Sequence, residues 1–244
     1  MVRRRSEVRA DAFGAFVVLG RNWRSFLGLL VVMGAMALVV VGLPEEFHGA
    51  EGVLFTLILA MGWLATIYML RQDLAGEEVL LRDGLFKSMA PLLTTLLMLG
   101  VVTLMCVPVM VTVVAWASAM ETHFVDMPFN ALMLILFSGA MAWLSGYLLS
   151  FGLMALTAVS APGMYPVAAL LMAHTLTAKK RVRVIFKVIL LAVVAGAMGA
   201  IVVVPLVMLG ARDTVVVAGA MGAGCIMTIY VATYLYLYYK ELLG

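Results

Sequence analysis

Long apolar stretches separated by short polar segments dominate the pattern of this chain. A helix needs about 20 apolar residues to cross about 30 Å of hydrocarbon, and lipid forces backbone groups to bond within the segment. Short segments of alternating polarity, which would indicate a β-barrel, are absent. We therefore predict an all-α integral membrane protein, a single polytopic domain over residues 1–244. Its six spans lie at about 25–43, 53–70, 89–117, 130–158, 184–209 and 214–238.

The composition agrees with burial in lipid. Hydrophobic residues make up 65% of the chain and charged residues only 12%, whereas a soluble domain carries about 25% charged residues. The lipid bilayer is therefore the main predicted partner, and we expect neither a cofactor nor a nucleic acid. Cys106 and Cys225 both lie inside apolar stretches without a neighbour at metal-ligand spacing, so we interpret them as packing residues.

The basic residues are distributed unevenly between the two sides of the predicted spans. Of the 16 Lys and Arg residues, only Arg212 lies on one side, and the rest fall in the N-terminal segment, the second and fourth connections or the C-terminus. Basic residues near span ends are retained in the cytoplasm. We therefore predict a multi-pass protein of the plasma (inner) membrane with both termini cytoplasmic. The opposite side is acidic and carries Glu45, Glu46, His48, Glu51, Glu121, His123, Asp126 and Asp213.

His48 and His123 lie near carboxylates, which raises the question of a metal site. Their spacing matches no metal motif, so we interpret them as solvated turn residues. None of the six spans has an ionisable residue at its centre, which argues against a proton-driven pump. Nucleotide-binding and catalytic motifs are also absent, so no catalytic residue is predicted.

Three segments on the predicted cytoplasmic side are not plain loops, at 11–23, 74–89 and 166–178. The first two mix apolar and charged residues, and the third begins with a proline at a good first-turn position. Such segments tend to lie in the membrane interface. They suggest that one unit occurs three times along the chain, at about 10–70, 74–158 and 164–240. Each unit would consist of an interfacial helix, a span that leads outwards, a short acidic turn and a span that returns. The alternative is that any six-span protein with short outer loops shows this pattern.

Small residues mark faces of the last three spans. Small residues four apart let helix backbones approach closely, so helix packing is a better interpretation than a pore or ligand role. The fifth and sixth spans are predicted to form a tight hairpin, and Pro108 and Pro205 are predicted to kink their spans. The predicted packing residues are Gly139, Gly146, Gly196, Gly199, Gly219 and Gly222.

Tyrosines gather near the end of the last span, which is typical of an aromatic belt at the membrane interface. We prefer this interpretation to an aromatic binding cage. The tyrosines are Tyr230, Tyr234, Tyr236, Tyr238 and Tyr239.

The cytoplasmic segments are the candidate contact surface for a cytoplasmic protein. The alternative is that they lie on the membrane, where each basic residue near anionic lipid contributes about 1 kcal/mol. The candidate partner or lipid contacts are Glu77, Glu78, Arg82, Asp83, Lys179, Lys180, Arg181 and Arg183.

The stretch from Ile67 to Met89 resembles the second cytoplasmic segment of YesL-like bacterial membrane proteins. In both, a span end bearing Tyr leads through a charged segment to an aromatic and a basic residue. The stretch from Ala168 to Lys180, followed by a basic run and a span, is similar to their next such segment. The likeness covers about half of the chain in pattern, and the family's Asn before its spans is matched only at Asn22.

The same pattern occurs in the membrane domain of some glycerophosphodiester phosphodiesterases. The resemblance implies a bacterial inner-membrane protein from a family linked with carbohydrate uptake, and it transfers no catalytic residue.

We consider three hypotheses for the function of the chain. The first is a non-enzymatic accessory or structural component of a transport system. The others are an ABC-type permease subunit and a membrane-embedded enzyme acting on lipids, which ranks last because the inner charges are scattered.

Overall fold

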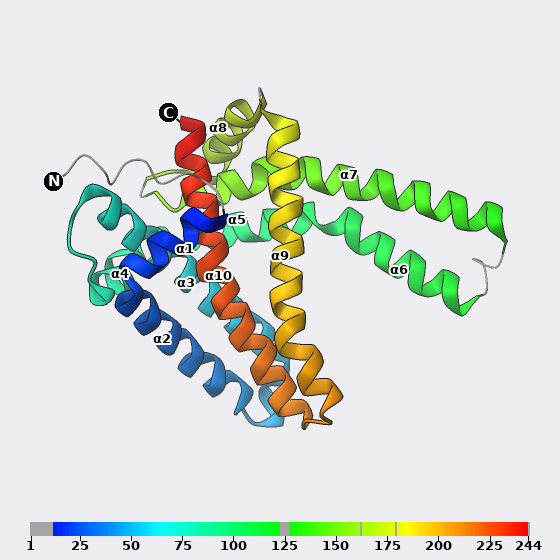
Figure 1. The fold of residues 1–244 in the computed structure, drawn as a ribbon, viewed down its shortest axis with the longest axis horizontal. Coiled ribbons are helices and arrows are strands. Elements are labelled where there is room, and N and C mark those ends of the chain that lie inside the picture. Colours follow the sequence, from blue (N-terminus) through cyan, green and yellow to red (C-terminus); the bar gives the residue numbers. More distant parts are fainter. Residues whose placement is uncertain (1–11, 123–126, 162, 179, 244) are drawn as a thin grey trace.

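The computed structural model describes residues 12–122, 127–161, 163–178 and 180–243, and its regular elements there are all helical (Figure 1). The predicted all-α membrane class is therefore confirmed. The elements are α1 (Ala12–Arg21), α2 (Trp23–Val41), the 3-10 helix η1 (Glu45–Ala50), α3 (Glu51–Ala75), α4 (Leu81–Lys87), α5 (Leu92–Met105), α6 (Val107–Glu121), α7 (Pro128–Val159), α8 (Pro166–Ala178), α9 (Arg181–Met208) and α10 (Asp213–Leu243).

The same order of elements occurs three times along the chain. A short helix, α1, α4 or α8, precedes a hairpin of long helices each time. The hairpins are α2–α3, α5/α6–α7 and α9–α10. The three short helices fall within the segments that the sequence analysis expected to lie in the interface. This order agrees with the predicted threefold plan at the level of element succession.

Five helices in the described part of the chain are long and apolar enough to cross a membrane, namely α2, α3, α7, α9 and α10. A sixth span is obtained when α4 and α5, which meet at an angle of 78°, are counted together. The chain is therefore a multi-pass membrane protein. The predicted third span, 89–117, is divided into two helices, because α5 ends at Met105 and α6 starts at Val107, close to the kink predicted at Pro108.

Pro108 causes this break between α5 and α6. Proline has no N–H, so the carbonyl of Leu104 loses its helical donor. The next donor, the N–H of Val109, reaches the carbonyl of Cys106 at 3.1 Å and the hydroxyl oxygen of Ser145 on α7 at 3.2 Å. The break is therefore held by a polar contact between α6 and α7. Pro205, by contrast, lies near the end of α9, which continues to Met208.

The three hairpins do not form a parallel bundle. Figure 1 shows that α2–α3 and α9–α10 run to neighbouring tips, whereas α6 and α7 extend away to a separate tip. Helix α10 packs against α9, α3, α2 and α7, and α3 also packs against α2 and α5. In the most apolar stretch of α3, 56% of the residues are buried. In the corresponding stretch of α9, only 11% are buried. The core therefore forms around α3 and α10, and α9 leaves most of its surface to lipid.

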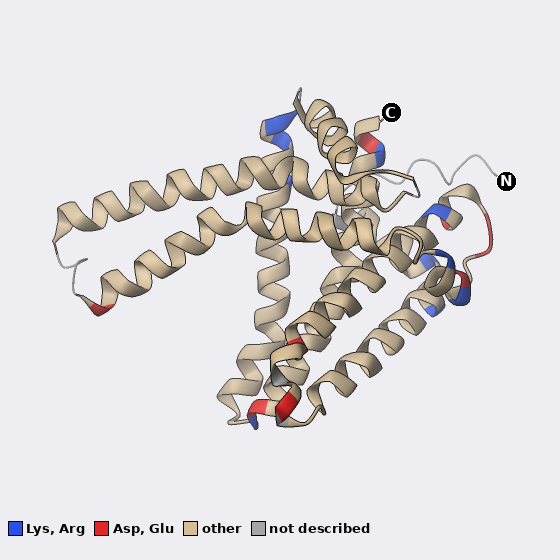
Figure 2. Cartoon of the chain, turned by 180° about the vertical axis from the view of Figure 1, so that it is seen from behind, with Lys and Arg blue, Asp and Glu red and all other residues tan. Residues whose placement is uncertain are grey.

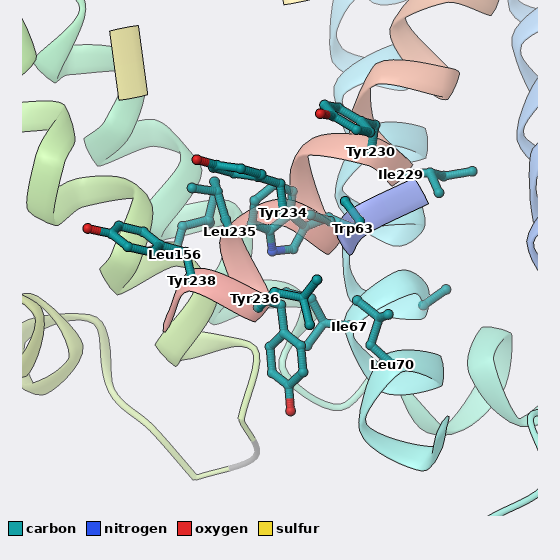
Figure 3. Packing of buried hydrophobic residues seen from close by; sticks show 14 of the residues in the cluster. Trp63, Ile67, Leu70, Leu156, Ile229, Tyr230, Tyr234, Leu235, Tyr236 and Tyr238 are labelled. Carbon is teal, nitrogen blue, oxygen red and sulfur yellow. The ribbon is translucent and has the colours of Figure 1, made fainter. Parts of the chain in front are cut away.

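The tyrosines of α10 belong to this core and do not form a belt. Tyr230, Tyr234, Tyr236 and Tyr238 are all buried, as are their neighbours on α10. Figure 3 shows them packed among residues of α3 and α7 such as Trp63. The belt prediction is wrong for these four residues, because α10 is covered on several sides over its last turns and leaves these rings no path to lipid.

Charges separate along the hairpins. Figure 2 shows acidic residues at the hairpin tips and nearly all basic residues near the opposite ends of the helices, which we call the basic end. Of the residues considered above, His123, Asp126 and Lys179 lie outside the described residues.

The predicted packing glycines differ in their surroundings. A Cβ added at Gly219 would lie 2.5 Å from Leu206 Cδ1 of α9, and one at Gly146 would lie 3.5 Å from Ile185 Cγ2. At Gly139, Gly196, Gly199 and Gly222 an added Cβ would meet no atom of another element within 4 Å. The structure therefore brings Gly219 and Gly146 to helix contacts and leaves the other four at open surfaces.

We predict that Gly219→Leu lowers stability in detergent by about 1–3 kcal/mol, because its side chain would overpack the contact with Leu206. Gly199→Leu is the matched control, since the same side chain would project into open space. Thermal unfolding of the purified chain measures both. An equal loss of stability in the two variants would contradict this packing.

Candidate functional site

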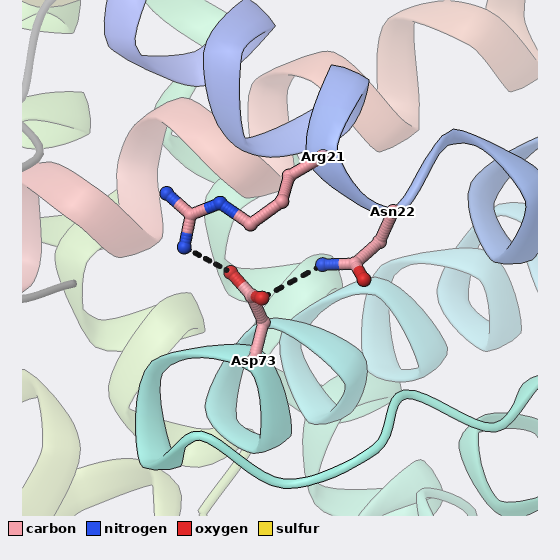
Figure 4. Close-up of polar contacts among 3 residues, drawn as sticks. All are labelled: Arg21, Asn22 and Asp73. Carbon is pink, nitrogen blue, oxygen red and sulfur yellow. Dashed lines mark hydrogen bonds and ion pairs between the residues drawn. The ribbon is translucent and has the colours of Figure 1, made fainter. Parts of the chain in front are cut away.

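A buried polar cluster joins α1, α2 and α3 at the basic end (Figure 4). The carboxylate of Asp73 accepts a hydrogen bond from Asn22 Nδ2 at 2.8 Å and an ion-pair contact from Arg21 Nη1 at 3.4 Å. Asp73 is 3% exposed, whereas the side chain of Arg21 is 31% exposed. A carboxylate buried to this degree requires such partners, because an isolated charge would lose its solvation.

The position of Asp73 follows from how α3 ends. Gly76 adopts a left-handed conformation with φ of 82°, which favours glycine at a helix C-terminus. The N–H groups of Gly76 and Glu77 then bond the carbonyls of Asp73 and Gln72. Asp73 is thus held in the last turn of α3, where the helix dipole disfavours a negative charge. Arg21 supplies the compensating positive charge.

Asn22 provides the second half of the cluster by separating α1 from α2. Its backbone carbonyl accepts the N–H groups of Ser25 and Phe26 at 3.0 and 3.2 Å, so its side chain is free to reach Asp73. The hydroxyl of Ser25 donates to the carbonyl of Val79 at 2.9 Å. The start of α2 is therefore tied both to the end of α3 and to the segment that leads into α4.

A hollow of about 660 Å³ opens beside this cluster. Arg21, Asn22 and Asp73 line it on one side, and Glu77 and Glu78 line it on the other. The exposed ring of Trp23 also borders the hollow, with the Arg24 guanidinium 5.6 Å from the ring centroid. The hollow thus combines an aromatic surface with charges of both signs.

Helix α4 is anchored next to this hollow. A Cβ at Gly84 would lie 2.9 Å from Met69 Cγ on α3, so only glycine allows α4 to approach so closely. The hydroxyl of Ser88 donates to the carbonyl of Gly84. Lys87 Nζ lies 2.7 Å from the Asp83 carboxylate, and that hydrogen bond and charge raise the pKa of Lys87 above its ordinary value.

The outer face of α4 and the preceding segment is exposed. Phe86 is 75% exposed, and Glu77, Glu78 and Arg82 are also exposed. We call residues 77–87, together with the adjacent hollow, the α4 face. It contains the candidate contact residues Glu77, Glu78, Arg82 and Asp83. Residues 77–87 carry three acidic and two basic groups, and the hollow adds Asp73, Arg21 and Arg24, so acidic and basic groups balance over the whole face.

The second group of candidate residues lies elsewhere, at the start of α9. Arg181 Nη2 lies 3.1 Å from His174 Nε2, and its guanidinium lies 4.7 Å from the Tyr147 ring centroid. Arg181 is thus held by α7 and α8, whereas Lys180 and Arg183 are exposed. Figure 2 shows this basic group apart from α4, so the structure does not bring the two groups together.

The sequence analysis missed Asp73 because it placed the end of the second span at residue 70. The missed signal is Gly76, since glycine often follows the last turn of a helix. Extending α3 to that glycine puts Asp73 on the helix. The search for ionisable residues near the spans would then have included it.

The described residues hold no group of three or more metal-ligating side chains. Comparisons of the chain with protein-family models, with curated proteins and with solved structures find no match. Function must therefore be argued from the geometry of the chain itself. The resemblance to YesL-like proteins stays a prediction.

We predict that Asp73→Ala lowers the free energy of unfolding by about 1–3 kcal/mol, because it leaves Arg21 and Asn22 without their acceptor. Asp83→Ala is the control, since its ion pair with Lys87 is exposed and contributes little to stability. Thermal unfolding in detergent distinguishes the two. A loss in Asp83→Ala as large as in Asp73→Ala would contradict the structural role of the buried cluster.

Proposed function

We propose that this protein is a non-catalytic component of a transport system in the plasma (inner) membrane, and that it recruits a cytoplasmic protein through the α4 face. The orientation comes first in the argument. Basic residues near span ends remain on the cytoplasmic side, and the basic end carries all three short helices. The α4 face is then directed towards the cytoplasm, and the acidic hairpin tips towards the outside.

This orientation predicts which positions react with an impermeant thiol reagent in intact cells. In a background without Cys106 and Cys225, cysteines at His48, His123 and Arg212 should be labelled. A cysteine at Lys179 should be labelled only after the membrane is permeabilised. Labelling at position 179 in intact cells would reverse the orientation and exclude a cytoplasmic partner at α4.

The observation that carries the docking proposal is an exposed phenylalanine on a firmly anchored surface, beside exposed carboxylates. Phe86 is 75% exposed on a helix that Gly84 holds against α3. Aromatic residues with a polar surround are typical anchors of protein interfaces. The acidic groups Glu77, Glu78 and Asp83 would be repelled by an anionic membrane surface. A protein partner therefore explains this combination better than lipid does.

The transport context rests on the resemblance to YesL-like proteins together with the short helix between spans. An ABC-type permease subunit is a second candidate, supported by the 78° angle between α4 and α5. A short helix that turns sharply into a span could meet an ATPase. The lipid-acting enzyme is the least supported alternative, since Asp73, the most buried carboxylate of the site, is engaged by Arg21 and Asn22.

A photo-crosslinking residue placed at Phe86 tests the docking proposal in intact cells. We expect a protein adduct of one size at position 86, which should disappear when Glu77 and Glu78 are changed to Lys. Phe129 is the matched control, because it is 66% exposed at the start of α7, near the opposite hairpin tip. Adducts to lipid alone at position 86 would contradict docking and favour the membrane-surface interpretation.

A further inference from the structure

Two cavities follow one seam between α3, α5 and α7. The first, of about 300 Å³, lies at the basic end, where Arg71, Pro91 and Ser160 contribute to its wall. The second, of about 250 Å³, is lined by Trp63 of α3, Leu99 of α5 and Leu156 of α7, together with residues of α10. Each of the three shared elements thus contributes first to one cavity and then to the other.

The order of the lining residues along α3 shows that the two cavities are stacked along the axis of this helix. On α3, Trp63 precedes Arg71 by eight residues, which is about 12 Å of helix. Along α5 the order is reversed. Pro91, directly before this helix, lines the cavity at the basic end, and Leu99 lines the deeper cavity. A single elongated ligand could therefore occupy both cavities.

The cavity at the basic end offers positive charge that the chain does not neutralise. Arg71 forms no ion pair with a carboxylate among the described residues, and its guanidinium lies 3.4 Å from Ser160 Oγ and 5.9 Å from the Tyr236 ring centroid. Lys87 also lines this cavity, although Asp83 pairs with it, and the exposed Glu77 forms part of the rim. Gln72 Oε1 is buried beside the cavity without a hydrogen-bond partner.

The deeper cavity suits a hydrocarbon chain. Its wall is mostly apolar. The Thr228 hydroxyl there donates to the carbonyl of Gly224, whereas Trp63 Nε1 and Thr95 Oγ1 are buried without a hydrogen-bond partner. Several wall residues, Leu59, Leu99 and Val231 among them, are only half-buried. In a membrane, an apolar cavity with such a wall is accessible to lipid tails.

From this stacking we infer that the seam is a binding site for one anionic phospholipid. The phosphate lies against the Arg71 guanidinium, which donates charge-assisted hydrogen bonds to it. The Ser160 hydroxyl, which donates to the carbonyl of Thr157 at 2.6 Å, accepts from Arg71 and orients it. Gln72 accepts a hydrogen bond from a hydroxyl of the headgroup. One acyl chain fills the deeper cavity. Basic pockets between spanning helices bind anionic headgroups in this manner, and the site shares Glu77 and Lys87 with the α4 face.

Native mass spectrometry of the full, delipidated chain in detergent tests the site with three probes. Long-chain phosphatidylglycerol should bind at least about fivefold more tightly than phosphatidylcholine of the same chains, as expected for one additional ionic contact. Glycerol phosphate, which has the charge without the chains, should not bind measurably. Equal binding of the two lipids, or equal binding of glycerol phosphate and phosphatidylglycerol, would overturn the proposal.

Substitutions at Arg71 and Val231 test where the lipid binds. Arg71→Gln should abolish the preference for phosphatidylglycerol, whereas Arg183→Gln, which removes an exposed charge at the same end, should retain it. Val231→Phe should lower the affinity for both lipids, because the larger side chain narrows the deeper cavity. If Arg71→Gln fails to fold, Arg71→Lys should keep a preference because it keeps the charge. Undiminished preference in Arg71→Gln, or unchanged affinity in Val231→Phe, would place the lipid elsewhere and refute the seam.

Discussion

The packing of α10 against the other helices is the contact on which the fold depends. Over its last turns α10 is buried by α1, α2, α3, α7, α8 and α9. Lipid provides no hydrophobic force between helices, so association depends on close packing and polar contacts. The rings of Tyr230, Tyr234 and Tyr238 fill the space where the hairpins meet. The hairpins diverge away from this point, and their outer parts leave large apolar surfaces for lipid.

Polar contacts, at the basic end and within the second hairpin, define how the helices meet. Asn22 and Arg21 fix the α1–α2 junction on Asp73 of α3, and Ser145 supports the break between α5 and α6. These contacts give direction to helices that packing alone would allow to slide or rotate. They also determine where α4 projects and how the seam between α3, α5 and α7 opens. The proposed docking surface and the proposed lipid site therefore share one framework.

The sequence predicted the helical membrane class, the element order and five of the six spans, because apolar length is a strong signal. It predicted less well where the environment of a residue depends on other helices. The tyrosines of α10 have the same sequence pattern whether they face lipid or protein, and only the neighbours of α10 decide between these. The six residues 195–200 are repeated at 218–223, yet of the four glycines in these stretches only Gly219 meets a neighbouring helix, at Leu206. Asp73 was missed for a local reason, because Gly76, which marks the end of α3, was not used to predict where this helix ends.

The place of α10 in chain order has a consequence for biosynthesis. Ribosomes deliver the first two hairpins to the membrane before the helix that both of them contact. Until α10 is inserted, Trp63 and Ile67 of α3 lack their partners on α10, and lipid must occupy that surface. The first two hairpins therefore remain loosely associated until α10 is inserted. Assembly is completed late, when the tyrosine-bearing turns of α10 enter between helices that are already in place.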